Sequence, residues 1–544
     1  MPRTVLWWIK KDFRLADNPA LTAALADGAR VVPVFLFEPA VLAAPETSGF
    51  HVAAWGEAFA ALADRIAEAT GRAPDACALA VHGDAVETLG RLRELVAFDA
   101  IHSHQEHGSD VTFSRDKAVA AWCRAEGVAW HEHRQTGVFR ALCDRDARSK
   151  KWKAFTADGP LPPPSADALA RVAVPDAAQA LAAPDLAPGA FGHPLSEAQW
   201  AHRQPVSESA AEATLTSFLT ERGQCYSGGI SSPNTAFVCG SRLSVHLAWG
   251  TMTGRQAYHA TEARQAEVKG SPLAADKQWA KSLRAFKSRL HWRDHFVQRL
   301  ESAPEQEFRP LNAAYEALPT PGDPHLGAWL EGRTGWPLVD ACMRCAATTG
   351  FLNFRMRAFV TSAAVHSLRI DWRKTLYPAA RLWADYEPGI HISQTQMQAG
   401  VVGINQLRVY SPPKQLADHD AGAVFVKRWV PELADVPPEA ILAHPEPHLM
   451  GSPVDGYPRP LVDWKASSKA MKDDYYAIKA LPETRALADA VYAAHGSRRS
   501  PKSRTWTSNT PRVSSVPRAG TRRIVRLADG SAPPADGSAP PADG

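Results

Sequence analysis

The sequence predicts an N-terminal α/β domain with a doubly wound parallel sheet, followed by an all-α C-terminal domain. Three observations predict this fold class. Residues 1–135 alternate short apolar runs with helical patterns, residues 157–192 are rich in Ala, Pro and Asp, and helical periodicity dominates beyond residue 208. At 544 residues the chain is also too long for one ordinary domain.

The apolar runs of the first part have the length and composition of buried strands. Runs that are apolar at nearly every position are typical of a parallel sheet covered by helices on both faces. The runs lie at 5–9, 31–37, 79–82, 100–103 and 128–131, with helices expected at 19–26, 51–69, 85–95 and 113–126. Such sheets bind ligands at the carboxyl ends of their strands. No GxGxxG follows the first run, so a Rossmann dinucleotide site is not indicated there.

The domain boundaries follow changes in composition. The α/β domain is expected to span residues 1–135, an inter-domain linker residues 136–207, and the helical domain residues 208–494. Helical periodicity predicts helices at 212–222, 241–265, 276–301, 336–347, 351–367 and 374–382. The tail, residues 495–544, has nine Arg or Lys and no acid between 496 and 526, and ends in a repeated Ser-Ala-Pro-Pro-Ala-Asp-Gly. This composition predicts disorder.

The overall composition, 45% apolar and 22% charged, is typical of a soluble globular protein. No stretch reaches 18 apolar residues and the N-terminus lacks a signal-peptide cleavage site, so a cytoplasmic location is expected. Seven Cys, an odd number, are typical of free thiols in a reducing compartment. Cys342 and Cys345 form a lone CxxC without further ligands nearby, so no metal site is predicted.

One segment, residues 277–296, concentrates basic and aromatic side chains. Six cations stand there against the single acid Asp294, with two Trp and two Phe interleaved among them. Cations contact phosphates and flat rings stack on unpaired bases, so the mixture suits a nucleic-acid surface. It equally suits an amphipathic helix with its aromatic face in the core and its basic face in water. Both interpretations remain open at this point.

Several motifs resemble the DNA photolyase/cryptochrome family. Residues 7–21, WWIKKDFRLADNPAL, resemble the family's opening signature, and GSRLS at 240–244 resembles its loop for the FAD phosphates. GRTGWPLVDACMR at 332–344 is similar to the most recognisable family block, and IDWR at 370–373 and RWVPEL at 428–433 follow at family spacing. These motifs keep the family order from residue 5 to about residue 465.

The resemblance implies that FAD is bound in the helical domain. The implied cofactor-binding residues are Tyr226, Gly240, Ser241, Arg242, Leu243, Ser244, Arg289, Arg357, Asp385, Tyr386, Glu387 and His391. Arg357 and Asp385 would form the pair beside the flavin ring, where a cation favours the reduced, anionic flavin; a surface ion pair is the alternative. An antenna chromophore, a folate or a deazaflavin, could occupy the N-terminal sheet, but no residue set selects one. His102, His104 and His107 are interpreted as surface loop rather than as ligands.

The resemblance also implies a pocket for a flipped-out pyrimidine dimer. Trp292 would form one wall, and the DNA-binding residues would be Lys281, Arg284, Arg293 and Arg355. The implied catalytic positions are Trp292, His391, Met397 and Trp372. The expected function is therefore light-driven repair of UV-damaged DNA by a monomeric, FAD-dependent photolyase. The alternative is a cryptochrome-type photoreceptor without repair activity.

The chain departs from the common family pattern at several of these positions. The family block Asn-Asn-x-Gly-Trp-Gln-Trp is HISQTQM at 391–397, which places Thr395 at the first electron-transfer Trp and Met397 at the second lesion wall. Trp372 keeps the middle place of the family's electron-transfer chain. Tyr386, Trp383 and Trp329 are candidates for another electron-transfer route to FAD. His391 either protonates flavin N5 or turns away to bond a backbone carbonyl.

Overall fold

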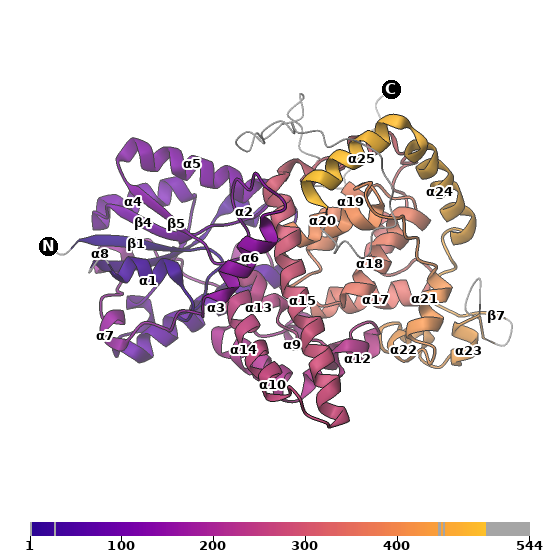
Figure 1. Ribbon diagram of the computed structural model, residues 1–544, viewed down its shortest axis with the longest axis horizontal. Coiled ribbons are helices and arrows are strands. Elements are labelled where there is room, and N and C mark those ends of the chain that lie inside the picture. The colour runs from indigo at the N-terminus through magenta and orange to yellow at the C-terminus, as the bar shows by residue number, and fades with distance from the viewer. Residues whose placement is uncertain (1–2, 27–28, 444–447, 450–451, 497–544) are drawn as a thin grey trace.

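The computed structural model describes residues 3–26, 29–443, 448–449 and 452–496. Its N-terminal sheet contains β1 (Thr4–Ile9), β2 (Arg30–Phe37), β3 (Leu79–His82), β4 (Ala100–His104) and β5 (Ala129–His133). All neighbouring strands are parallel, in the order β3-β2-β1-β4-β5, so the chain winds outward from β1 in both directions (Figure 1). The predicted doubly wound sheet is confirmed.

Helices cover both faces of this sheet. They are α1 (Pro19–Ala26), α2 (Pro39–Leu42), α3 (Gly49–Thr70), α4 (Ala85–Val96) and α5 (Asp110–Glu126). Alternate residues of β1 point to opposite faces, so Val5 and Trp7 lie in the core formed with α1 and α3. Leu6 and Trp8 lie in the core formed with α4 and α5. Burial on both faces is the reason that the strand sequences are almost uninterruptedly apolar.

The predicted linker, residues 136–207, packs against the α/β domain. It contains α6 (Arg148–Ala157), α7 (Ala166–Leu169), α8 (Asp176–Gln179) and α9 (Glu197–His202). Val172 pairs with Val31 at the edge of β2 and is buried, with Leu169, in the core of the α/β domain. The segment therefore returns across the first domain before the chain enters the second.

The remainder is helical, as predicted. Its helices are α10 (Glu208–Thr220), α11 (Tyr226–Gly229), α12 (Pro233–Cys239), α13 (Ser244–Trp249), α14 (Gly254–Glu267), α15 (Ala274–Ser302), α16 (Leu326–Leu330), α17 (Pro337–Thr349), α18 (Phe354–Ser362), α19 (Trp372–Ala380), α20 (Pro388–Ala399), α21 (Pro412–His419), α22 (Val424–Trp429), α23 (Pro438–Ile441), α24 (Trp464–Ala480) and α25 (Pro482–His495). A two-stranded hairpin, β6 (His448–Leu449) and β7 (Ser452–Pro453), is added to them. Within the described ranges, no helix is both long and apolar enough to cross a membrane. The predicted tail lies outside the described residues from 497 onward.

Polar groups of the segment after β1 fasten the two domains together. Arg14 is fully buried, and its Nη1 donates a hydrogen bond of 2.8 Å to the carbonyl of Gly250. Asp17 is ion-paired with Arg255 and accepts a 2.6 Å hydrogen bond from Thr253 Oγ1. The carboxylate of Glu208 accepts the backbone N–H groups of residues 15 and 16 at 2.9 and 3.0 Å. Each buried charge at this contact thus has a partner, as burial requires.

Gly250 is where the backbones of the two domains come closest. Its φ of +74° lies in the left-handed region, and a Cβ placed on it would lie 1.8 Å from the carbonyl oxygen of Lys11. The helix predicted over 241–265 therefore breaks here, ending α13 at Trp249 and leaving α14 to begin at Gly254. Glycine at this position allows the domains to meet.

Gly250→Ala should reduce the stability of the protein strongly. The left-handed backbone alone costs a Cβ-bearing residue roughly 1–2 kcal/mol, and the overlap with the backbone of Lys11 adds to this, so we expect a total loss of about 3 kcal/mol or more. Gly254→Ala is the matched control, because a Cβ there meets nothing within 4 Å. Urea unfolding followed by circular dichroism would contradict this account of the interface if both variants unfold at the wild-type midpoint.

Candidate functional site

Helix α15 contains the basic and aromatic segment, residues 277–296, and provides several residues of the candidate site. Trp279 and Phe286 are buried in the core against Tyr226, as the amphipathic interpretation predicted. Lys281 and Arg284 are exposed on the opposite side. Trp292 is only half-buried and stacks on Phe296 with ring centroids 5.8 Å apart. The first half of the segment is therefore core and solvated face, and the second half offers an accessible aromatic surface.

A close contact between α15 and α20 places the acidic residues of the site. A Cβ on Gly389 would lie 2.5 Å from the Cα of Val297, so the first turn of α20 can lie directly against α15. Glu387, which precedes α20, is thereby held 2.9 Å from Arg293 Nη2. Arg293 also donates to Leu247 O at 2.8 Å and pairs with Asp294 at 3.2 Å. Because its guanidinium is occupied, the structure argues against the predicted contact of Arg293 with a DNA phosphate.

Arg357 and Asp385 form an ion pair of 2.8 Å. The Asp385 side chain is only 10% exposed, so the alternative of a surface ion pair is wrong. Arg357 Nε donates to Leu352 O at 2.7 Å, and its guanidinium lies 4.4 Å from the ring of Trp383. The guanidinium is thus fixed from three sides beside a buried carboxylate.

The predicted phosphate loop, residues 240–244, connects α12 to α13. Arg242 in this loop has a φ of +59° and places its guanidinium 3.6 Å from the ring centre of Phe351. Burial lowers the pKa of Arg242 to about 10, and Asp385 offsets part of that shift. Its Nη1 is buried without a hydrogen-bond partner. A buried cationic N–H without a partner is costly unless an anion binds there.

Tyr226 packs in the same core cluster as Leu243 of this loop and interacts with Arg289 of α15. Burial raises the pKa of Tyr226 to about 12, and a hydrogen bond from Arg289 offsets part of the rise. Arg289 is exposed on α15. The guanidinium groups of Arg242, Arg289 and Arg357 together suit a cofactor with phosphates and an anionic ring. The donor set therefore fits FAD.

His391 makes the second of its two predicted interactions. Its Nε2–H donates a 2.7 Å hydrogen bond to the backbone carbonyl of Leu376. Burial lowers the pKa of His391 to about 4, so the imidazole is neutral at neutral pH. A neutral imidazole whose only N–H is held by a carbonyl is not a proton donor, and its Nδ1 is left as an acceptor. The predicted protonation of flavin N5 by His391 is therefore wrong.

A series of aromatic rings leads from His391 toward the first domain. Tyr386 lies 5.6 Å from His391 and stacks on His51 at 5.6 Å; His51 lies 5.4 Å from Trp249, which lies 5.6 Å from Trp55. Trp372 belongs to a different cluster, with Leu376 and Tyr475. Trp383 and Trp329 are buried in the core around α17, and Met397 is half-buried on α20. Of the predicted alternatives, Tyr386 is the one that continues into a chain of rings.

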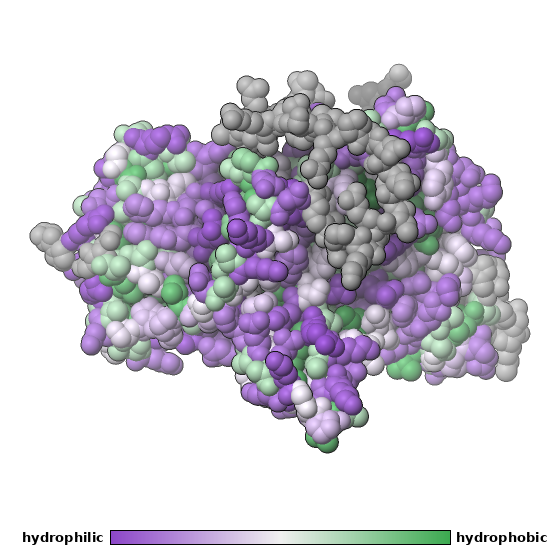
Figure 2. All heavy atoms as spheres, in the orientation of Figure 1, coloured by the Kyte–Doolittle hydropathy of each residue, from purple (hydrophilic) through white to green (hydrophobic). Residues whose placement is uncertain are grey.

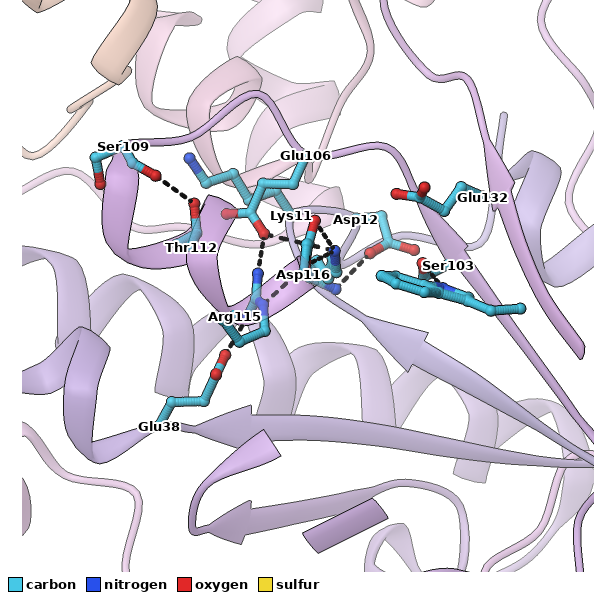
Figure 3. Close-up of polar contacts among 12 residues, drawn as sticks. Lys11, Asp12, Glu38, Ser103, Glu106, Ser109, Thr112, Arg115, Asp116 and Glu132 are labelled. Carbon is cyan, nitrogen blue, oxygen red and sulfur yellow. Dashed lines mark hydrogen bonds and ion pairs between the residues drawn. The ribbon is translucent and has the colours of Figure 1, made fainter. Parts of the chain in front are cut away.

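This series ends in a pocket at the carboxyl ends of β1, β2 and β4. Aromatic side chains line it: Trp8, Phe35, His51, Trp55, Trp249 and Tyr386. Figure 3 shows its charged wall, where Glu38, Glu106 and Asp116 surround Arg115. Lys10 Nζ completes the network at 2.7 Å from Asp116. The position agrees with the predicted binding edge of the sheet.

The three histidines near this edge are buried, so their interpretation as surface loop is wrong. β4 is an inner strand of the sheet, and both of its faces are covered. His104 Nδ1 lies 2.9 Å from Asp12, and His107 Nδ1 lies 2.8 Å from Glu301. His102 contacts His133 across the β4–β5 pair, with 3.1 Å between ring nitrogens. These residues stabilise the sheet edge.

The prediction that all cysteines are free thiols is also wrong. Cys225 and Cys239 form a disulfide with their Cα atoms 5.3 Å apart, because α11 and α12 fold back on each other. Cys225 immediately precedes Tyr226, and Cys239 immediately precedes the 240–244 loop. The CxxC residues Cys342 and Cys345 are buried on α17, where burial raises the pKa of Cys345 to about 12. They therefore remain protonated core thiols.

Comparison with known proteins agrees with this arrangement. Residues 5–157 match the family model of DNA photolyase, and residues 286–477 match that of the FAD binding domain of DNA photolyase. The deoxyribodipyrimidine photo-lyase of a Synechococcus species is 27% identical over 506 residues, covering 88% of this chain and 98% of that protein.

Two solved structures share the fold. A class III photolyase from Agrobacterium tumefaciens superposes with a TM-score of 0.72 at 23% identity, covering 88% of this chain and 98% of the other. A photolyase from Sulfolobus tokodaii, described with two FAD molecules, gives a TM-score of 0.67 at 24% identity, covering 87% of this chain and all of the other.

Opening the disulfide should weaken FAD binding. It ties the Tyr226 segment to the loop, and a crosslink of this size contributes roughly 3 kcal/mol of loop ordering. We expect Cys225→Ser to raise the dissociation constant for FAD by roughly tenfold, which is less than half of that free energy. A reducing agent should have the same effect on the wild type and none on the variant. Cys143→Ser, at an exposed free cysteine, is the control. Equal FAD affinity of all three proteins by fluorescence titration would contradict this role.

Proposed function

Because this chain belongs to the DNA photolyase/cryptochrome family, we propose that it uses light absorbed by FAD to split UV-induced pyrimidine dimers in DNA. The observation that carries the proposal is the half-buried Arg357–Asp385 pair. Asp385 lies two residues before Glu387, which pairs with Arg293, the residue that follows Trp292 on α15. This connection joins the charged groups suited to a flavin with the half-buried, accessible aromatic surface suited to a base.

FAD, when bound, supplies the light absorption and the one-electron chemistry of this reaction. The protein contributes binding and electrostatics. Tyr226, Arg242 and Arg289 would hold the phosphates and the adjoining part of the cofactor. Arg357 would favour negative charge on the ring, while Asp385 holds that arginine in place. A neutral His391 accepts hydrogen bonds through Nδ1 and keeps its proton on the side of Leu376.

The DNA side of the site is the accessible half of α15. The Trp292–Phe296 stack offers a flat wall on which an extruded dimer can lie, and Met397 adds an apolar surface from α20. A damaged base pair is extruded at lower cost than a normal one, which favours the lesion. Lys281, Arg284 and Arg355 are exposed and remain the proposed contacts to the DNA backbone.

The pocket at the sheet edge is the proposed place of a second, light-harvesting chromophore. The photolyase from Sulfolobus tokodaii is described as holding two FAD molecules, with a novel light-harvesting cofactor implied. Here the lining of rings suits a flat aromatic chromophore, such as a flavin, a deazaflavin or a folate. Tyr386 and Trp249 line this pocket and also belong to the ring series that begins at His391.

A cytoplasmic location and a monomeric state also belong to this proposal. In a reducing cytoplasm the Cys225–Cys239 pair would be open for part of the time, since thiol systems there reduce accessible disulfides. FAD affinity in the cell would then follow the local redox conditions.

Light-dependent repair of an irradiated oligo(dT) tests the proposal. The FAD-loaded protein should remove dimers under blue light and none in darkness. Trp292→Ala should lose its preference for damaged over undamaged DNA by roughly tenfold or more, because stacking contributes roughly 1–3 kcal/mol per base. Trp200→Ala, at a Trp 44% exposed on α9, is the control. Undiminished dimers after illumination would remove the repair function and leave the photoreceptor alternative.

A further inference from the structure

A cluster of basic side chains is enclosed where α6 packs beside the upper part of α15 (Figure 1). His291, His295 and Arg299 lie four residues apart on α15, so they share one face of that helix. Two arginines come from the start of α6 and the turn before it, and a histidine from the end of α25. The members are Arg145, Arg148, His291, His295, Arg299 and His495.

The histidines of the cluster serve as acceptors for its arginines. Arg145 Nη2 lies 2.6 Å from His295 Nδ1, and Arg148 Nη1 lies 3.1 Å from His291 Nε2. Burial and the neighbouring arginines lower the pKa of His295 to about 2 and that of His291 to about 4. Both rings are therefore neutral, and they supply hydrogen-bond acceptors but no negative charge.

Two of the arginines keep buried donors for which no described residue provides an acceptor. Arg148 is 1% exposed, and its Nε has no hydrogen-bond partner. Arg299 is 5% exposed, and both its Nε and its Nη1 have none. Burial lowers the pKa of each guanidinium to about 10, so both stay charged at neutral pH. The ring of Phe296 lies 5.5 Å from the Arg299 guanidinium, but a ring face cannot satisfy two in-plane N–H groups.

The carboxylate that favours the charge of Arg148 is already in use. Asp294 accepts hydrogen bonds from the Gly137 N–H at 3.0 Å and from Trp152 Nε1 at 2.9 Å, and it pairs with Arg293 at 3.2 Å. Arg148 and Arg299 therefore keep donors that this carboxylate does not satisfy. Buried charges in folded proteins are normally paired, and orphan donors on two guanidiniums that both act on His295 are the pattern that an oxyanion would satisfy.

We propose that this cluster binds a phosphate group. The half-buried His291 and His495 mark the side from which it enters. The phosphate is either a free phosphate ion or one phosphate of a DNA strand, and the second source rests on the function proposed above. His295 lies 5.1 Å from Trp292, so a bound backbone phosphate would adjoin the proposed lesion wall.

The exposed half of α15 leads to the same place. Lys277, Lys281 and Arg284 precede the cluster on the same face of the helix, at spacings of three, four or seven residues. Hydrophilic side chains also dominate the surface over α6 and the middle of α15 (Figure 2). A DNA strand that follows these cations along α15 would reach Arg148 and Arg299 beyond Arg284.

The first test is thermal unfolding of the FAD-loaded full chain, with inorganic phosphate added at constant ionic strength. Phosphate at 100 times its dissociation constant should raise the wild-type melting temperature by roughly 3–6 °C relative to chloride. Arg299→Gln and Arg148→Gln should abolish the rise. Without phosphate, each variant should melt at or above the wild-type temperature, because an uncompensated charge has been removed. Arg344→Gln is the control: its guanidinium is paired with Glu432 at 2.7 and 3.0 Å, so its loss should lower the melting temperature and keep the phosphate effect.

The second test uses undamaged oligo(dT) in darkness, so its result is independent of repair. If the phosphate belongs to DNA, Arg299→Gln should reduce the slope of log affinity against log salt by about 1, the contribution of one phosphate contact. Lys281→Gln, on the exposed part of α15, should also reduce this slope by about 1. A response to free phosphate alone assigns the site to the ion, and a change of slope assigns it to DNA. If Arg148→Gln and Arg299→Gln match the wild type in both tests, the site does not exist.

Discussion

The contact between the segment after β1 and the turn at Gly250 is the constraint on which the rest of the structure depends. It is built from buried ions that are all satisfied: Arg14 by backbone carbonyls, Asp17 by Arg255 and Thr253, and Glu208 by backbone N–H groups. The turn follows α13, and α13 follows the 240–244 loop. The same contact therefore fixes one end of the proposed cofactor loop, while the Cys225–Cys239 disulfide fixes the other.

Buried arginines distinguish the structural parts of this molecule from the parts that await a ligand. Arg14 is as buried as any side chain in the protein and has partners for each of its three nitrogens. Arg148 and Arg299 are also buried and Arg242 is half-buried, yet each keeps at least one buried donor without a partner among the described residues. An unpaired buried charge costs several kcal/mol. Such a cost is tolerated where function requires it, and both places lie beside the surfaces that the proposed reaction uses.

Much of the fold follows from the sequence because the strands are buried on both faces. Every predicted strand is present within one or two residues of its expected ends, and helix α1 has the predicted bounds. The prediction of one helix over 241–265 was wrong because helical periodicity is a local pattern. It contains no information on the close contact between Gly250 and Lys11 of the other domain. The disulfide was missed for a similar reason, since sequence spacing does not show that α11 and α12 fold back on each other.

The sequence predicted which residues belong to the site better than it predicted the contacts between them. The Arg357–Asp385 pair is present, but the partners of Arg293 and His391 are set by tertiary neighbours, Glu387 and the carbonyl of Leu376. His291, His295 and Arg299 could have been grouped by their spacing on α15, whereas Arg148 comes from a distant segment that only folding brings to them. The ring series through His51 and Trp249 crosses the domain boundary and has no signal along the chain.

The central claim is that light absorbed by a flavin in the helical domain drives chemistry on DNA. The action spectrum of dimer removal tests this claim most directly: the rate is measured at equal photon flux across the near-ultraviolet and blue, and compared with the absorption of the bound cofactors. The account predicts a rate that follows the absorption of protein-bound FAD, with an added band if the pocket at the sheet edge holds a second chromophore. A rate that is independent of wavelength, or that persists in darkness, would contradict it.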